Sequence, residues 1–279
     1  MNTLQKSLIV AAGVVTLGAG SYYYSEANKT FRDKAQTFLG IKEKEHPQAI
    51  YNGCFVIFDP SGSTSSTYSV PKIDTTYVKQ LVEKIHEHGY GDIWVTFIDQ
   101  DALNNKIIYF KVTEQPAKLE IPVRNPGESR SSFNKRQEEF KKDNYANETA
   151  IAKHQIQFQG ELSKFLTDCH AMIQKEYSGK PKIEDWSDIT GSVNAATRTF
   201  STVTPDSVHF RSVLLVSDGV QSLPKGVKQK PLDAIPSDVK IVTVNNGGSP
   251  KNILRGRTIE VENLSRALNL VIHQQKPGG

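Results

Sequence analysis

The sequence has few of the residues that several common protein classes need. Only two cysteines occur in 279 residues, which is too few for a zinc site built on cysteine ligands. Cys54 lies in a predicted strand and Cys169 in a predicted helix. Buried residues in separate elements favour free thiols over a disulfide. The cysteines therefore exclude a Cys-based metal centre.

The chain also has little net charge. Its formal net charge is +4, and its lysines are spread along the sequence rather than gathered into a patch. A nucleic-acid-binding protein would need such a basic patch, so no nucleic-acid partner is expected. The hydrophobic content of 37% is that of an ordinary globular protein with a somewhat thin core.

Sequence motifs of the common enzyme classes are missing as well. The chain has no Gly-x-x-x-x-Gly-Lys-Ser/Thr for nucleotide phosphates, no Gly-x-Ser-x-Gly elbow and no His-Glu-x-x-His. Its seven histidines form no ligand cluster along the sequence. These absences argue against an enzyme.

The one long apolar run lies at the N-terminus. Residues 7–24 carry no charge and approach the ~20 residues of a membrane-spanning helix, while Tyr22-Tyr23-Tyr24 suit the membrane surface. We predict a transmembrane anchor over 1–25, hence a single-pass membrane protein, with a juxtamembrane linker over 26–50. A cleaved signal peptide of an exported protein is the alternative, because Gly18-Ala19-Gly20 offers small residues for cleavage. The flanking charges leave the side of the membrane open.

The stretch Cys54-Phe55-Val56-Ile57-Phe58-Asp59 is an apolar run that ends in an aspartate. Its β-branched and aromatic residues, bounded by Asn52-Gly53 and Pro60, predict a buried strand. Asp59 then lies at the carboxyl end of that strand, where open α/β sheets bind their ligands. Asp59, Ser61 and Ser63 offer a carboxylate and two hydroxyls in one short turn. Such hard oxygen ligands suit Mg²⁺ and suit zinc or copper poorly.

Two later stretches complete a recognisable pattern. Ser187-Asp188-Ile189-Thr190 leads into a predicted helix, and the apolar run 213–216 ends in Ser217-Asp218-Gly219. Together with Asp59-x-Ser61-x-Ser63, and in the same order, these stretches resemble the three loops of the metal-ion-dependent adhesion site of von Willebrand factor type A domains. The resemblance covers about residues 51–273, which is most of the chain.

The resemblance implies a site for Mg²⁺, with Mn²⁺ or Ca²⁺ as alternatives. The residues that would bind the ion are Asp59, Ser61, Ser63, Ser187 and Asp218. Thr190 is a second candidate for the hydroxyl of the second loop, and Asp188 is either a further residue of that loop or the cap of the helix after it. The resemblance also implies a protein partner whose acidic side chain completes the coordination.

An aspartate after a strand also fits an aspartyl-phosphate enzyme. That class needs a second acid two positions further on, where this chain has Ser61. We therefore predict a binding protein and no enzyme, with a Mg²⁺-dependent phosphohydrolase as the enzymatic alternative.

A long helix interrupts the family pattern. Residues 130–178 are rich in Lys, Glu and Gln, and only the later half repeats apolar residues such as Phe158, Leu162 and Phe165 at helical spacing. Type A domains have a shorter element here. We interpret this insert as a helix that projects into solvent, with a partner-binding arm as the alternative. The alternative function is thus an interaction module with a metal-free site that binds through the insert.

Predicted strands and helices alternate along the chain. The strands are expected over 54–58, 93–98, 107–112, 213–216 and 239–244, and the helices over 73–88, 130–178, 193–200 and 261–272. This alternation predicts an α/β fold with a doubly wound, mostly parallel, Rossmann-like sheet flanked by helices. The domain would span 51–275, with the strand at 107–112 near an edge and a disordered tail at 276–279.

Overall fold

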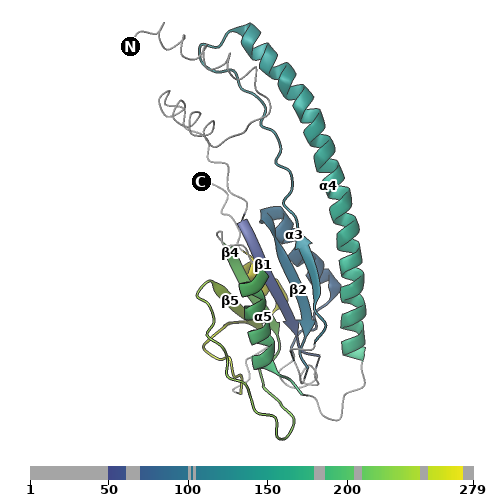
Figure 1. The fold of residues 1–279 in the computed structure, drawn as a ribbon, viewed down its shortest axis with the longest axis vertical. Coiled ribbons are helices and arrows are strands. Elements are labelled where there is room, and N and C mark those ends of the chain that lie inside the picture. The colour runs from purple at the N-terminus through teal and green to yellow at the C-terminus, as the bar shows by residue number, and fades with distance from the viewer. Residues whose placement is uncertain are drawn as a thin grey trace, which may run out of the picture. The chain divides into compact units, whose positions relative to one another are not determined.

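Six strands form a single sheet in the order β3-β2-β1-β4-β5-β6 in the computed structural model (Figure 1). Strands β1 (Ile50–Phe58), β2 (Gly89–Phe97), β4 (His209–Val216), β5 (Val239–Val244) and β6 (Ile259–Val261) run parallel, and β3 (Ile108–Val112) pairs antiparallel with β2 at the edge. The order reverses between β1 and β4, as in doubly wound sheets. The predicted α/β fold with a mostly parallel, Rossmann-like sheet is confirmed.

The structure describes residues 50–60, 70–99, 102, 105–178, 186–203, 209–245 and 251–272, all within the compact unit Ala49–Gly279. The predicted anchor, nearly all of the predicted linker and the predicted tail lie outside these residues. Ser61 and Ser63 also lie outside them. Within the described ranges, no helix is both long enough and apolar enough to cross a membrane.

Helices cover both faces of the sheet. On one face, Cys54, Val56 and Phe58 of β1 pack against α3 (Thr75–His88), the later half of α4 (Arg130–Ser178) and α6 (Leu264–Val271). On the other face, Phe55 and Ile57 pack against α5 (Ile189–Val203), which lies in front of the sheet in Figure 1. A strand buried on both faces needs apolar residues at every position, which explains the continuous apolar run of β1.

Helix α4 has the predicted bounds and extends far beyond the sheet (Figure 1). Its 49 residues span about 73 Å at the usual rise per residue. Its buried side chains all lie between Phe158 and Ile173. Two side chains of the earlier half hold the extended segment before α4: Asn147 donates to the Ala117 carbonyl (3.0 Å) and Arg136 to the Val123 carbonyl (3.0 Å). We call residues 113–157, which comprise this segment and the earlier half of α4, the arm.

Several predicted boundaries were wrong. Strands β1 and β4 begin at Ile50 and His209, earlier than the predicted starts at residues 54 and 213, and α5 begins at Ile189. Strand β2 begins at Gly89 rather than at residue 93, because its register with β1 starts at the pair Ile50 and Gly89. Glycine has a low strand propensity, so only the tertiary pairing extends the strand there. Val261 belongs to the short strand β6 and not to the closing helix, which begins at Leu264 after its cap Asn263.

Both cysteines are buried and free, as predicted. Cys54 lies in β1 and Cys169 in α4. Burial raises the pKa of each thiol to about 12. A thiol that stays protonated at neutral pH is a poor nucleophile, so both cysteines serve as small apolar core residues.

Candidate metal-binding site

The candidate site lies where the strand order of the sheet reverses. Phe58 at the end of β1 pairs with Val216 at the end of β4, and the Asp59 backbone N–H donates to the Val216 carbonyl (2.9 Å). Asp59 and Ser217 therefore follow aligned strand ends, with Asp218 one residue further. Sheets of this kind bind ligands at this edge and at this reversal point.

Two serine hydroxyls surround the Asp59 carboxylate, which is only 1% exposed. Ser217 Oγ donates to Asp59 Oδ2 (3.0 Å), and Ser187 Oγ lies 3.4 Å from both carboxylate oxygens. Of the two candidate hydroxyls in the second loop, the structure therefore brings Ser187 to Asp59. Thr190 instead makes two contacts with Gln221 Oε1, from its backbone N–H (3.1 Å) and from its hydroxyl (3.4 Å).

Asp218 adds a second buried carboxylate from the end of β4. Its Oδ1 accepts a hydrogen bond from the Val220 backbone N–H (2.9 Å). Burial raises the pKa of Asp218, and the charge of Asp59 raises it further. A cation would stabilise the ionised form of Asp218, which burial and the charge of Asp59 disfavour.

Asp188 caps helix α5. Its Oδ1 accepts from the Gly191 backbone N–H (2.9 Å) and from Gln221 Nε2 (3.1 Å). A carboxylate at this position satisfies an N–H that has no partner within the helix. Of the two roles expected for Asp188, the structure shows the cap.

The second and third loops are joined by backbone as well as side chains. Ser187 and Ser222 exchange two backbone hydrogen bonds (2.7 and 3.1 Å), next to the contacts of Gln221. Neither Ser217 nor Gln221 was predicted as a site residue from the sequence. Ser217 was accessible from the expected alignment of the two strand ends, whereas nothing local in the sequence marks Gln221 as a link between loops.

The end of α4 also reaches this edge of the sheet. The Tyr177 ring packs against Phe58 (centroids 5.4 Å apart), and its hydroxyl accepts from the Ile73 backbone N–H (3.3 Å). Burial, with a smaller contribution from the charge of Asp59, raises the pKa of Tyr177 to about 12. Tyr177 thus holds the segment that leads from the first loop into α3.

Replacing Gly191 with alanine should destabilise the protein by about 1–2 kcal/mol. A Cβ at this position would collide with the Asp188 carboxylate and displace it from its two hydrogen bonds. Gly160 in α4 is the control, because a Cβ there meets nothing within 4 Å. Alanine at Gly160 should instead stabilise the helix by about 0.5–1 kcal/mol. Urea unfolding of both variants measures the difference, and two stabilising substitutions would contradict the capping role.

The described donors fit a hard divalent cation. Asp59, Asp218 and Ser187 supply two carboxylates and a hydroxyl, which are oxygen ligands of the kind that Mg²⁺ and Ca²⁺ prefer. Among the residues that the structure describes, no group of three or more His, Cys, Asp or Glu side chains is placed to hold a metal ion. The predicted site has only two such residues and completes its set with hydroxyls. No protein-family model matches the chain, and no curated protein matches it either.

Proposed function

We propose that this protein is a membrane-attached von Willebrand factor type A-like module that recognises a protein partner through a bound divalent cation. Mg²⁺ is the ion we favour, with Mn²⁺ or Ca²⁺ as alternatives. The observation that carries the proposal is the convergence of Asp59 and Asp218 on aligned strand ends, with the Ser187 hydroxyl beside Asp59. The apolar run at residues 7–24 supports membrane attachment.

Each residue of the site has a distinct task in this proposal. Asp59 and Asp218 supply negative charge, and Ser187 supplies a neutral oxygen. Ser217 orients the Asp59 carboxylate through its hydrogen bond (3.0 Å). Ser61 and Ser63 are the further ligands that the resemblance implies. When bound, the cation would supply a Lewis-acidic position for a carboxylate of the partner.

The contacts around Asp59 support binding rather than catalysis. Two serine hydroxyls donate to its carboxylate and orient it. The neighbouring acid, Asp218, is itself held by the backbone at Val220. This arrangement favours a fixed cluster of oxygen ligands over an acid–base pair.

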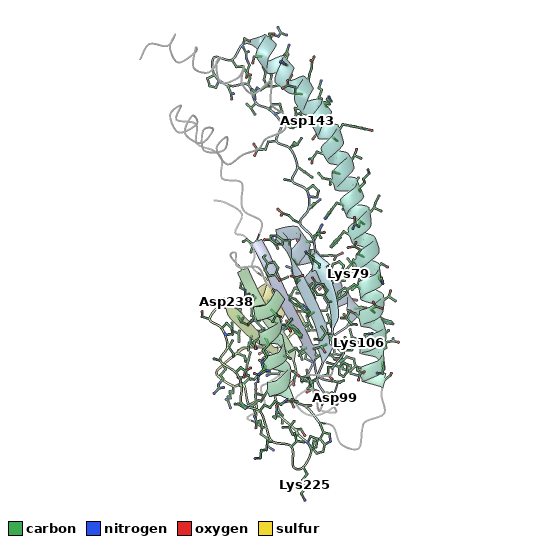
Figure 2. The ribbon with its side chains drawn as sticks, in the orientation of Figure 1. Lys79, Asp99, Lys106, Asp143, Lys225 and Asp238 are labelled. Atoms are coloured by element: carbon green, nitrogen blue, oxygen red, sulfur yellow. The ribbon has the colours of Figure 1, made fainter. Side chains whose placement is uncertain are left out.

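Calorimetric titration of the full chain with Mg²⁺ and Mn²⁺, in a mild detergent, tests the proposal. We expect the wild type to bind both ions and the Asp59→Ala variant to lose binding, because the first strand then offers no carboxylate. Asp143→Ala is the matched control, since Asp143 lies on the arm away from the sheet (Figure 2). Equal binding by wild type and Asp59→Ala, or no binding by the wild type, would contradict the metal site.

The arm supports a second candidate function. Its apolar side chains Ile121, Val123 and Tyr145 are 76%, 78% and 76% exposed, which is unusual for large apolar residues on one surface element. In this alternative the protein binds its partner through the arm, and the edge of the sheet is metal-free. Once a partner has been identified, partner binding that is unchanged in the Asp59→Ala variant would support binding through the arm.

A further inference from the structure

The loop that follows strand β4 carries three lysines. Residues 223–230, here called the lysine loop, contain Lys225, Lys228 and Lys230, all exposed. The acids that follow them are engaged elsewhere, since Asp233 pairs with Arg198 (2.8 Å) and Asp238 with Arg211 (3.1 Å). None of the ion pairs found among the described residues involves the three lysines. The loop is therefore a local surface of uncompensated positive charge.

Contacts with the second loop and with α5 hold the two ends of the lysine loop beside the candidate metal site. On one side, Ser222 pairs with Ser187 through the backbone. On the other side, Gln229 Nε2 donates to Thr190 Oγ1 (3.5 Å), and Asn194 Nδ2 donates to the Pro231 carbonyl (2.9 Å). The two contacted residues of α5 lie one helical turn apart. Lys228 and Lys230 flank Gln229, so the backbone that carries them lies at the start of α5.

A tight turn places the third lysine at the tip of the loop. The Val227 backbone N–H donates to the Pro224 carbonyl (3.0 Å), and Gly226 has a φ of +90°. A positive φ at the third position is the mark of a type II turn and favours glycine there. Lys225 is therefore at the second position, and it lies at the outer end of the loop in Figure 2. Val227 beside it is 52% exposed.

We propose that the lysine loop is a second contact surface for the partner of the metal site, and that this partner presents an acidic protein segment. The inference rests on the proposed function. One carboxylate on a cation does not distinguish partners, because almost every protein surface offers one. Three exposed positive charges on a loop whose ends are held beside the site add selectivity for neighbouring acids in the partner. They also attract such a segment at long range and raise the association rate.

Binding of a fluorescent oligoglutamate peptide to the full chain tests this inference. The variant carries Lys225→Gln, Lys228→Gln and Lys230→Gln. The control carries Lys141→Gln, Lys142→Gln and Lys153→Gln, which remove the same charge from exposed positions on the arm. We expect binding that requires Mg²⁺, about tenfold weaker affinity in the lysine-loop variant at low salt, and no change in the control. The difference should shrink at higher salt, where charges are screened.

The outcomes separate this inference from the proposed function. Unchanged affinity in the lysine-loop variant, with the Mg²⁺ requirement kept, would overturn the inference alone. Peptide binding by the wild type that ignores both Mg²⁺ and Asp59→Ala would overturn the proposed function. A DNA duplex that competes as well as the peptide would show a basic surface without preference for acidic protein, and would also overturn the inference.

Discussion

Replacing Phe165 with alanine should destabilise the protein by about 3–5 kcal/mol, as expected for truncating a buried aromatic side chain. Phe165 is 4% exposed, and its ring stacks on Phe110 of β3 with centroids 5.0 Å apart. Alanine would leave a cavity between α4 and the edge of the sheet. Among the strands that the structure describes, β3 is the outermost at this edge, so the later half of α4 supplies much of its apolar cover.

The matched control for this substitution lies in the same helix. Tyr145 is 76% exposed, and Tyr145→Ala should change the free energy of unfolding by no more than about 0.5 kcal/mol. Urea unfolding monitored by circular dichroism measures both variants. Equal large losses would mean that the arm packs as part of the domain core. Equal small losses would mean that α4 is not held by its later half.

The contrast between the two halves of α4 was visible in the sequence, because burial leaves a periodic record. Phe158, Leu162 and Phe165 recur at helical spacing and are all buried, whereas the earlier half has no comparable stripe. The bounds of α4 were predicted from this stripe together with the Lys-, Glu- and Gln-rich composition of residues 130–178. The packing of the extended segment on the arm was not predictable, because it depends on polar contacts such as that of Asn147 with the Ala117 carbonyl.

Whether a strand could be predicted also depended on the apolar pattern that its burial leaves in the sequence. The later parts of β1 and β4, residues 54–58 and 213–216, are buried on both faces and read as continuous apolar runs, so these parts were predicted. β6 has only three residues, which is too short for any alternation to stand out. Gly89 and Gly91 are read locally as a turn, yet the pairing with β1 includes both in β2. The start of β2 is thus set by its long-range pairing with β1 and not by the strand preference of its own residues.

Some features of the candidate site could be predicted from the sequence and others could not. Asp59 and Asp218 could be placed together, because the ends of neighbouring parallel strands meet at one edge of a sheet. The choice between Ser187 and Thr190 could not be made from spacing. It depends on where α5 begins: Ser187 precedes the helix, while Thr190 falls in the first turn and bonds to Gln221. The role of Ser217 could have been inferred from the expected alignment of the two strand ends, whereas nothing local in the sequence marks Gln221 as a link between loops.

The second large expected effect is the loss of stabilisation by Mg²⁺ in the Asp218→Asn variant. We expect Mg²⁺ to stabilise the wild type by about 2.7 kcal/mol at a concentration a hundredfold above its dissociation constant, and to stabilise Asp218→Asn hardly at all. The asparagine Oδ1 can still accept from the Val220 N–H, which is a 2.9 Å bond in the parent, so the turn is preserved. Without metal, the variant should be at least as stable as the wild type, since the repulsion with Asp59 is gone.

The pH dependence of the same variant gives an independent check. A carboxyl whose pKa is raised on folding binds its proton more tightly in the folded state, so its contribution to stability falls as pH rises from its ordinary pKa through the raised one. Burial and the charge of Asp59 raise the pKa of Asp218 in this way. Urea unfolding in EDTA between about pH 4 and pH 7 should show this loss in the wild type and not in Asp218→Asn. Mg²⁺ should cancel it, because a bound cation stabilises the deprotonated carboxylates.

The alternative account of Asp218 makes the opposite predictions. If Asp218 only closes the turn after β4, its substitution should change stability by the same amount with and without Mg²⁺. The Asp143→Asn variant on the arm supplies the reference for a charge change remote from the site. A residue that only closes a turn gains nothing from the repulsion between two buried acids. An Asp218→Asn variant that is more stable than the wild type in EDTA, and that Mg²⁺ does not stabilise, would therefore support a ligand role for Asp218. Such a residue sacrifices stability for binding, as functional sites commonly do.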